Sequence, residues 1–356
     1  MERTDLILSI AEKIKDYRKG EIEEIVPKHV DRWARQFDLN AQLTILNEIN
    51  HILNTFYLNR EDVKVNLRSV LLDERISGKN PKTTLAKINF LHIQTSGNSQ
   101  REMLNLVDEI IKEEFNLTID QCGGSNLFFY IDDCIFTGNR FRYDVVPWIN
   151  KTSFNSGSKL ITYHIAQHVK GYNYAINHIM QAARVNKIEV SSWHHKKIDN
   201  NKGDGVTPEI LWPSYLSGDQ YIDNYYNQVK DICQKKGWLD TCYRTHTITK
   251  DVLFTSPKAR DIVEDAFLKV GSRLITAASN PAPSIRPLGF EKLESLGFGT
   301  FFITHRNISN NCPLALWYGD PTQTGGPLSL WYPLFIRKTQ GSNFTIDFTT
   351  NWEDLF

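Results

Sequence analysis

Short apolar runs separated by longer amphipathic stretches dominate the middle of this 356-residue chain. Four runs have the length of buried β-strands and lie at residues 86–94, 126–133, 159–167 and 187–193. Between them, apolar positions recur at helical spacing in three stretches, at 99–115, 141–148 and 172–185. Strands that are apolar throughout and alternate with helices are typical of parallel sheets covered on both faces. The pattern therefore predicts an α/β fold built on a parallel sheet.

The flanking regions have a different pattern. Before residue 76 the apolar positions follow helical spacing, and the breaker-rich stretch 77–84 ends this region. Beyond residue 200 the pattern predicts helices at 218–237 and 256–270 and strands at 299–307 and 313–319. We therefore predict three consecutive segments: a helical N-terminal lobe at 1–80, the α/β core at 81–200, and a C-terminal α+β lobe packed on the core at 201–356.

Composition narrows the class of protein. Hydrophobic residues make up 41% of the chain, which is enough for a sizeable core. The 41 basic residues are balanced by 41 acidic ones, and this balance disfavours a protein whose main function is to bind nucleic acid. The five cysteines form no CxxC pair or zinc-type cluster. The sequence contains neither a signal peptide nor an apolar stretch of membrane-spanning length. We expect a soluble cytoplasmic protein with no membrane partner.

Two adjacent carboxylates stand at the end of the second apolar run, and a Thr-Gly turn follows them. Ligands of open parallel sheets bind at the carboxyl ends of the strands, where Asp132 and Asp133 would accept hydrogen bonds from sugar hydroxyls. The turn at Thr137 and Gly138 opens a helix, and helix N-termini favour phosphate. This pairing suits a ribose 5-phosphate. The alternative is a plain strand end with Thr137 as a helix cap.

The segment IDDCIFTG (131–138) resembles the loop by which type I phosphoribosyltransferases bind phosphoribosyl pyrophosphate (PRPP). The resemblance implies that Asp132 and Asp133 are the catalytic pair, which orients the ribose directly or through the Mg²⁺ of Mg-PRPP. It implies that the 5-phosphate is held by the turn that comprises Thr137, Gly138, Asn139 and Arg140. The family usually has Ser or Thr where this chain has Arg140, and an arginine either adds a phosphate contact or blocks the pocket.

The loop after the first apolar run corresponds to the pyrophosphate-binding loop of the same enzymes. The resemblance assigns that role to Ser96, Gly97, Asn98 and Ser99. The alternative is that Ser99 caps a helix and Gly97 occupies a turn. The chain departs from the family pattern after the helix at 99–115, because only a short stretch separates it from the next strand and leaves no room for a catalytic loop. This departure weakens the case for transfer more than the case for binding.

Taken as a whole, the chain resembles an atypical group of phosphoribosyltransferase-like proteins found in bacterial conflict and anti-phage cassettes, including retron-linked ones. The resemblance rests on the segments DRWARQF (31–37), SGNSQ (96–100), YIDDCIFTGN (130–139), ITHRNISNNCPLALWYG (303–319) and LWYPLF (330–335). It implies a defence effector whose partner is another protein or a nucleoprotein of the defence system.

Further polar residues are weaker candidates. In the late polar turn, Arg306, Asn307 and Asn310 either read an acceptor base or ribose or satisfy the backbone of their own loop. His194 and His195 follow the fourth predicted strand and are either catalytic or a surface pair.

Three hypotheses for function follow. The first is an enzyme that uses Mg²⁺ and acts on PRPP or a related ribose 5-phosphate, either as a phosphoribosyltransferase or as an N-glycosidase that cleaves nucleotides. The second is a catalytically degenerate module that senses a nucleotide or docks a partner. The third, nucleic-acid binding through the helical N-terminal lobe, has only scattered Lys and Arg in its favour.

Overall fold

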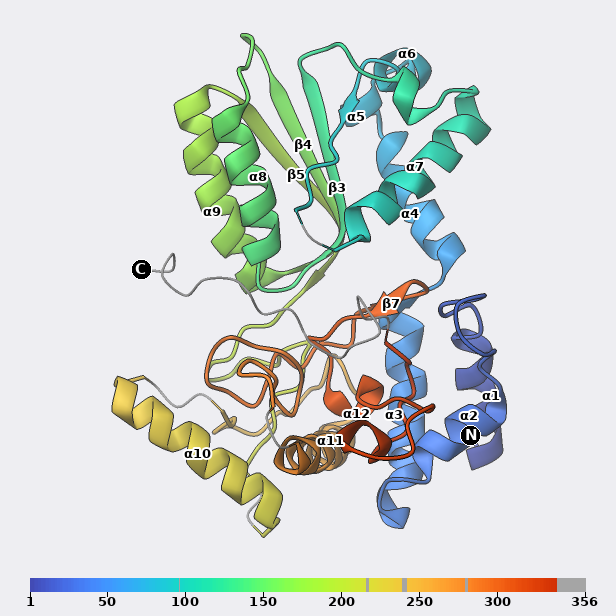
Figure 1. Ribbon diagram of the computed structural model, residues 1–356, viewed down its shortest axis with the longest axis vertical. Helices are drawn as coiled ribbons and strands as arrows, with labels where there is room; N and C mark the ends of the chain where they lie inside the picture. The colour runs from blue at the N-terminus through green and yellow to red at the C-terminus, as the bar shows by residue number, and fades with distance from the viewer. Residues whose placement is uncertain (96, 216–217, 239–241, 279–280, 338–356) are drawn as a thin grey trace. The chain divides into compact units, whose positions relative to one another are not determined.

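The structure is a computed structural model that describes residues 1–95, 97–215, 218–238, 242–278 and 281–337 (Figure 1). The chain divides into two compact units. The first unit combines Met1–Tyr57 with Leu211–Phe356, and the second is Leu58–Ile210. The predicted segments 1–80, 81–200 and 201–356 do not coincide with these units, because helices at the start of the chain pack with helices of its last third.

A four-stranded parallel sheet forms the centre of the second unit. The strands lie in the order β2 (Asn89–Phe90), β3 (Leu127–Ile135), β4 (Lys159–His168) and β5 (Glu189–Ile198). The predicted α/β class with a parallel sheet is confirmed. All but the first residue of β4 are buried, as expected of a strand that has neighbours on both sides and helices over both faces.

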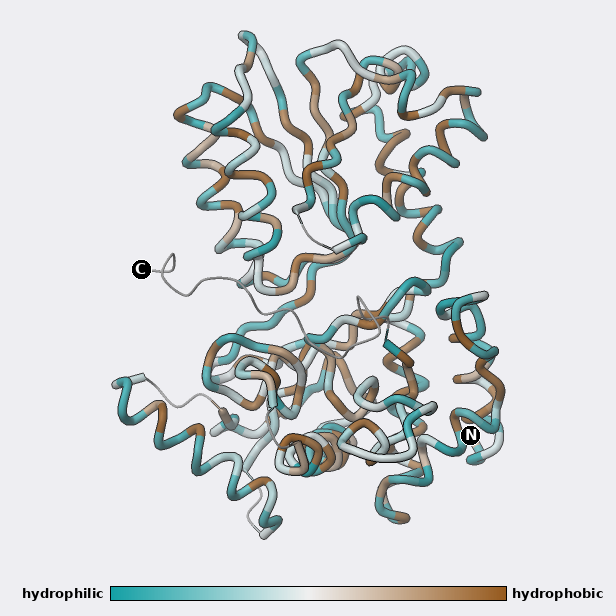
Figure 2. Tube along the Cα trace, viewed as in Figure 1, coloured by the Kyte–Doolittle hydropathy of each residue, from teal (hydrophilic) through white to brown (hydrophobic). Residues whose placement is uncertain are grey.

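Helices lie on both faces of this sheet (Figure 1). On one face, α8 (Asn139–Lys151) packs beside α9 (Val169–Asn186), and on the other α7 (Ser99–Phe115) packs on α4 (Arg60–Leu71). Figure 2 shows apolar stretches on the strands and mixed apolar and polar positions along the helices. The core beneath α8 and α9 contains Tyr130, Ile135, Phe141, Val145, Ile149, Leu160, Ala175, Ile179 and Ala183.

A row of ion pairs joins α4 to α7. The pairs are Arg60–Glu109 at 2.6 Å, Lys64–Glu113 at 2.7 Å and Arg68–Glu114 at 2.9 Å. Each acidic partner is at least 37% exposed, and ion pairs that face solvent in this way contribute little to stability. The row therefore joins the two helices along their exposed side.

The edge strands differ from their predicted extents. β2 covers only Asn89–Phe90 of the run predicted at 86–94, because the backbone N–H groups of Ile93 and Gln94 donate to the side chain of Gln100 instead of to a strand. At the opposite edge, β5 continues to Ile198. His194 and His195 therefore lie within this strand, and the prediction that they follow it was wrong.

The first unit is mainly helical. Its helices are α1 (Arg3–Lys13), α2 (Pro27–Ala34), α3 (Leu39–Phe56), α10 (Gln220–Lys236), α11 (Pro257–Ala277) and α12 (Leu314–Trp317). The strand predicted at 313–319 was wrong, since this run contains α12, and an apolar run alone does not distinguish strand from helix. The run at 299–307 contains β6 (Ile303–Thr304), which pairs with β7 (Asn307–Ile308).

Five short elements complete the secondary structure. They are β1 (Tyr57–Leu58), α5 (Glu74–Ser77), α6 (Pro81–Leu85), η1 (Ile119–Gln121) and η2 (Pro327–Ser329). α6 begins where the sequence placed a breaker: Pro81 occupies its first position, and Asn80 Oδ1 accepts a hydrogen bond from the Thr83 N–H at 3.3 Å. The proline and asparagine of this stretch therefore start a helical turn.

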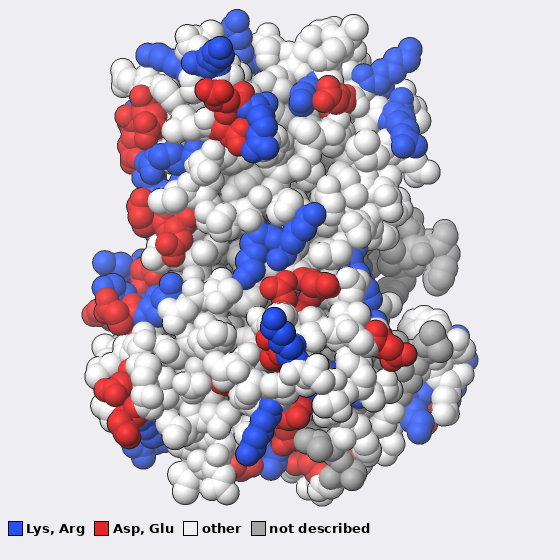
Figure 3. Space-filling model, turned by 180° about the vertical axis from the view of Figure 1, so that it is seen from behind, with Lys and Arg blue, Asp and Glu red and all other residues white. Residues whose placement is uncertain are grey.

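The charged surface is mixed. On the face drawn in Figure 3, basic and acidic groups are interspersed, and no large area of one sign stands out. This face does not have the one-sided basic surface that is typical of nucleic-acid binding. Within the described ranges, no helix has the length and apolar character needed to cross a bilayer.

A buried ionic cluster stabilises the first unit. The side chain of Arg260 is 0% exposed and pairs with Asp251 and with Glu264, whose Oε1 lies 2.9 Å from Arg260 Nη1. Glu264 also accepts the Trp212 N–H at 2.8 Å. Burial raises the pKa of Glu264, and the guanidinium groups of Arg260 and Arg244 oppose that rise. The cluster therefore depends on each charge retaining its partners.

We predict that Arg260→Met lowers the free energy of unfolding by about 3–5 kcal/mol, because it takes the paired cation from buried Asp251 and leaves Glu264 with Arg244 alone. Urea denaturation followed by tryptophan fluorescence measures this loss. The control is Arg35→Met, whose side chain is 69% exposed and pairs with Asp31, and which should change stability by less than about 0.5 kcal/mol. Equal effects of the two substitutions would contradict the prediction.

Candidate functional site

The acidic pair, Asp132 and Asp133, lies in the second half of β3. Asp132 is 4% exposed and Asp133 is half-buried. Asp132 Oδ1 accepts the Asp133 N–H at 2.9 Å, and Asp133 Oδ1 accepts the Cys134 N–H at 2.7 Å. Because β3 continues to Ile135, the strand ends two residues beyond the pair. Asp133 is the more accessible carboxylate, and Asp132 is held inside the unit.

A further buried carboxylate, which the sequence analysis missed, lies near this pair. Asp144 of α8 is 2% exposed, and burial raises its pKa. The Tyr130 hydroxyl donates to Asp132 Oδ2 at 3.4 Å, and the pKa of Tyr130 is raised by burial and by the charges of Asp132 and Asp144. A phenol has a single proton to donate, so it satisfies the two carboxylates only in part. The one signal in the sequence was a carboxylate within the apolar stripe of a helix.

Asp144 attaches the loop after β2 to α8. Its Oδ1 accepts hydrogen bonds from the Thr95 backbone N–H at 3.2 Å and from the Thr95 hydroxyl at 3.1 Å. One helical turn earlier, Arg140 reaches the same hydroxyl at 3.5 Å. The two loops that the sequence assigned to pyrophosphate and to 5-phosphate therefore meet through Thr95.

The loop after β2 is held by two glutamines. Gln100 is 0% exposed, and its Oε1 accepts the N–H groups of Ile93 at 2.7 Å and Gln94 at 2.9 Å. In return, Gln94 Oε1 accepts the Gln100 N–H at 3.1 Å. This reciprocal pair closes the loop, and neither glutamine was singled out from the sequence.

Three of the four pyrophosphate-loop candidates, Gly97, Asn98 and Ser99, lie in the described part of this loop. Gly97 has φ +90°, a conformation that favours glycine. Ser99 is the first residue of α7, and its hydroxyl accepts Gln94 Nε2 at 2.8 Å. Asn98 precedes the helix, and its Oδ1 accepts Arg101 Nη2 at 2.8 Å. Ser96 lies outside the described residues. The assignment of these residues to pyrophosphate stays a prediction.

The turn between β3 and α8 rests directly on α9. Gly138 has φ +84°, and a Cβ atom there would lie 2.1 Å from the carbonyl oxygen of Gly171. A Cβ atom on Gly171 would lie 1.9 Å from the carbonyl oxygen of Phe136. Two glycines thus allow backbone to touch backbone at this point. Gly138 makes this close approach to α9, and its partner Gly171 was not identified from the sequence.

The first turn of α8 is suited to an anion. Gly138 is its N-cap and has no side chain to occupy the free N–H groups that follow. Thr137 and Asn139 are half-buried at this end, and Arg140 is exposed. An uncapped helix start with a cation beside it favours negative charge. The four residues predicted for phosphate are contiguous here, but their role stays a prediction.

His164 is a buried histidine that the sequence analysis missed. It pairs in register with Asp132 on β3 and with His194 on β5. It is 1% exposed, and within the described part of the chain neither ring nitrogen has a hydrogen-bond partner. Its ring packs edge-on against Phe141, with centroids 4.5 Å apart. Burial lowers its pKa to about 3, so the ring is neutral near pH 7.

A second buried histidine, His168, packs against the end of β3, where the β3–α8 turn begins. His168, at the end of β4, makes a hydrogen bond through Nδ1 to the Ile135 carbonyl at 2.9 Å and stacks on Phe136 with centroids 5.3 Å apart. Burial lowers its pKa to about 4. By contrast, His194 and His195 are exposed on β5. The histidines that the sequence suggested are thus on the surface.

The predicted acceptor-side residues belong to the first unit. Asn307 begins β7, and its Oδ1 accepts the Tyr17 hydroxyl at 3.4 Å. The Asn310 carbonyl accepts the Phe290 N–H at 2.7 Å. Arg306 lies in the turn between β6 and β7. These contacts stabilise the loop, and a role in reading an acceptor stays a prediction.

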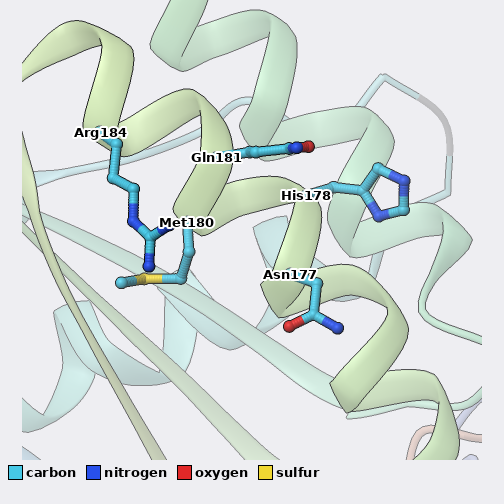
Figure 4. Close-up of a pocket in the computed structure, with 5 residues that line it drawn as sticks. All are labelled: Asn177, His178, Met180, Gln181 and Arg184. Carbon is cyan, nitrogen blue, oxygen red and sulfur yellow. The ribbon is translucent and has the colours of Figure 1, made fainter.

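A surface hollow of about 250 Å³ lies on α9 (Figure 4). It is lined by Asn177, His178, Met180, Gln181 and Arg184, all from that helix. These residues follow the first turn of α9, which contacts the β3–α8 turn through Gly171. The hollow contains neither of the acidic pair and does not include the predicted site.

Metal binding at the acidic pair depends on oxygen ligands. Over the described ranges, no three His, Cys, Asp or Glu side chains are grouped as a metal site. Asp132 and Asp133 are hard oxygen donors of the kind Mg²⁺ accepts, usually one or two carboxylates together with substrate phosphates. Asp133, the more accessible of the two, suits such a ligand, and the assignment of Mg²⁺ to the pair stays a prediction.

The comparisons with known proteins gave one match. The sequence model of the PRTase-CE family matches residues 30–337. This range includes the whole second unit and most of the described part of the first. Searches of curated proteins and of solved structures found no match.

We predict that Gly171→Ala destabilises the second unit by about 1–3 kcal/mol, because its Cβ forces the β3–α8 turn away from α9. Thermal unfolding measures the loss. The control is Gly203→Ala, where the nearest atom to the new Cβ, Val206 Cγ2, would be 4.0 Å away. A Gly171→Ala protein as stable as the Gly203→Ala protein would show that this contact is looser than the structure has it.

We also predict that His164 makes stability fall with acid. Its pKa is lowered from 6.5 to about 3 in the folded state, so between these values the unfolded chain binds a proton that the folded chain does not. The free energy of unfolding therefore decreases as pH falls through this window, by up to about 1.4 kcal/mol per pH unit from this residue. His164→Leu should give a shallower pH dependence in urea titrations, whereas exposed His51→Leu should leave the slope unchanged. An unchanged slope in His164→Leu would refute the assignment.

Proposed function

Because the chain belongs to the PRTase-CE family, we propose that the β3–α8 turn binds the ribose 5-phosphate part of PRPP or of a nucleotide. The observation that carries the proposal is the accessible carboxylate of Asp133, five residues before Gly138, the N-cap of α8 that has no side chain. A carboxylate accepts hydrogen bonds from sugar hydroxyls, and free N–H groups at a helix start donate to phosphate. One short segment therefore offers the complementary groups for both parts of the ligand.

The two acidic residues take different roles in this proposal. Asp133 contacts the ribose hydroxyls, because it is the more exposed of the two. Asp132 is buried and holds the backbone of Asp133 through the 2.9 Å hydrogen bond. Thr137, Gly138, Asn139 and Arg140 surround the 5-phosphate. The loop of Gly97, Asn98 and Ser99 lies on the pyrophosphate side, tied to α8 through Thr95.

Mg²⁺ is part of the proposal. When bound, it neutralises phosphate charge and stabilises the departing pyrophosphate. In this chain, Asp133 would hold it together with ligand oxygens, and Asp132 would act through its hydrogen bond to the Asp133 N–H. The protein's own contribution is to fix the ribose and to aim backbone donors at the phosphates, which makes positioning and electrostatic stabilisation the main sources of rate enhancement.

The proposed reaction takes place at the anomeric carbon of the ribose. In a phosphoribosyltransferase, an acceptor nitrogen forms a bond to this carbon as pyrophosphate leaves. In an N-glycosidase, water attacks the same carbon of a nucleotide and the base leaves with a proton. Both reactions require the ribose and the 5-phosphate to be bound in the same way. The contacts proposed for Asp133 and the β3–α8 turn therefore support the two reactions equally.

A second candidate is a sensing or docking module without turnover. Two observations favour it: Asp132 is only 4% exposed, and Arg140 reaches Thr95 instead of standing clear of the turn. A site in which Asp132 stays buried could still bind ribose phosphate, but it would no longer catalyse transfer of the phosphoribosyl group. This candidate uses the same residues as the enzyme and differs from it only in that no product would form in the turnover assay.

The cellular role that we propose follows from the sequence resemblance to conflict-cassette proteins. PRPP and nucleotides are cytoplasmic metabolites, so we place the protein in the cytoplasm. There it would act as an anti-phage effector, including in retron-linked systems, whose activity is kept in check by a partner protein or nucleoprotein.

The test measures binding and turnover together. We predict that PRPP with Mg²⁺ binds the wild-type chain and that Asp133→Asn weakens binding about 10- to 100-fold, because a charge-assisted acceptor is lost. Calorimetry measures affinity, and release of pyrophosphate or free base measures turnover with pooled nucleotides and bases. Asp120→Asn, an exposed carboxylate of the same unit, is the control and should bind normally.

The outcomes separate the candidates. Turnover that disappears in Asp133→Asn supports the enzyme, and tight binding without product supports the sensor. Binding that is equal in wild type, Asp133→Asn and Asp120→Asn would rule out the β3–α8 turn as the site.

A further inference from the structure

The first unit contains a partly buried arginine, Arg337, that has no acidic partner among the described residues. Arg337 stacks its guanidinium over the ring of Trp317, with 5.4 Å between the guanidinium carbon and the ring centroid. Its Nε is buried and has no hydrogen-bond partner in the described structure. Burial lowers its pKa, and the groups that oppose this shift are Tyr17 and Cys312, not a carboxylate. A partly buried guanidinium without a carboxylate beside it would be stabilised by a bound anion.

Other buried arginines of the same unit are paired. The side chain of Arg244 is 4% exposed and lies 3.3 Å from Glu264, and that of Arg286 is 10% exposed and lies 3.0 Å from Glu294. Arg260 pairs with Glu264 at 2.9 Å. Each of these guanidinium groups is therefore paired with a carboxylate. Arg337 differs from them, and the difference needs a physical explanation.

A second arginine converges on the same place. The Arg18 side chain is 11% exposed, and its Nη1 donates to the carbonyl of Ile336, the residue before Arg337, at 2.9 Å. The Arg18 backbone has φ +48°, an unusual value for a non-glycine residue, and its N–H donates to the His305 carbonyl at 2.6 Å. The loop after α1 thus lies beside the β6–β7 turn, as Figure 1 also shows. A strained backbone held in this way is often found at binding sites.

Positive charge exceeds negative charge at this corner. Arg306 lies in the adjoining β6–β7 turn, so three arginines come from three parts of the chain. Two acids of the described loop after α1 have other partners: Glu21, which is 45% exposed, pairs with Arg18 at 3.2 Å, and Asp16 accepts the Tyr57 hydroxyl at 2.6 Å. Neither is paired with Arg337. The corner therefore has the composition of a site for a multiply charged anion.

We propose that Arg337, with Arg18 and Arg306, forms a binding site for a phosphate group in the first unit. Arginine forks match the oxygens of phosphate, and a dianion balances more than one guanidinium at once. The Trp317 ring is itself fixed by a 2.7 Å hydrogen bond from its Nε1 to the Cys312 carbonyl, so it holds Arg337 in place for the ligand. The site is separate in sequence and unit from the β3–α8 turn and does not depend on the function proposed for that turn.

The test uses inorganic phosphate with the full chain at constant ionic strength. In wild type, phosphate should raise the unfolding temperature of the first unit, since a ligand stabilises the state that binds it. Arg337→Met should abolish this rise and weaken phosphate binding in calorimetry by about tenfold or more. The matched control is Arg35→Gln, an exposed and paired arginine of the same unit, which should respond like wild type.

Stability without phosphate gives a second readout. A structural arginine would destabilise the protein when removed, whereas loss of an unpaired buried charge should leave Arg337→Met at least as stable as wild type in phosphate-free buffer. An Asp132→Asn, Asp133→Asn double variant should retain the phosphate response of the first unit, which separates this site from β3. Three results would each overturn the proposal: an unchanged response in Arg337→Met, an equal effect of acetate on wild type, or no phosphate response in wild type.

Discussion

The contact between two glycine backbones is the constraint on which the rest of the second unit depends. Gly138 and Gly171 leave no room for a Cβ atom on either side, so the end of β3 and the start of α9 have one possible spacing. That spacing fixes where α8 begins and therefore the angle from which Arg140 and Asp144 leave the helix. Asp144 in turn holds Thr95 and the loop after β2. Two loops that are far apart in sequence are thus positioned by one steric condition.

This constraint also explains why the centre of the unit tolerates so many polar groups. Asp132, Asp144 and His164 are all at most 4% exposed around Tyr130 and Phe141. Placing these groups in a core disfavours their charged forms, which is why His164 is neutral and the pKa of Asp144 is raised. Buried polar groups of this kind are retained only where several contacts hold the surrounding backbone in place. Rigid backbone contacts at the turn supply that condition.

The sequence predicted the parts of the structure that depend on local pattern. The apolar runs identified β3 and β4 because these strands are buried along most of their length, and helical spacing identified α7, α9 and α11. The acidic pair and the turn after it were identified because they are contiguous. Gly171, Asp144 and His164 were missed because each is ordinary within its own segment. Each has a partner more than 30 positions away, namely Phe136 for Gly171, Thr95 for Asp144 and Asp132 for His164, and no local pattern records such a contact.

Charge balance decides what the β3–α8 turn requires of any ligand. Asp132, Asp133 and Asp144 bring three carboxyl groups close to a helix start where Arg140 is the neighbouring cation. A phosphate adds further negative charge to this group. Binding of the phosphate that we propose for this turn would therefore be favoured by a divalent cation shared with the phosphate or by a proton on Asp144, whose burial already raises its pKa. Either route would keep the proposed ligand and its counter-charge together, whether the ribose is then cleaved, transferred or only sensed.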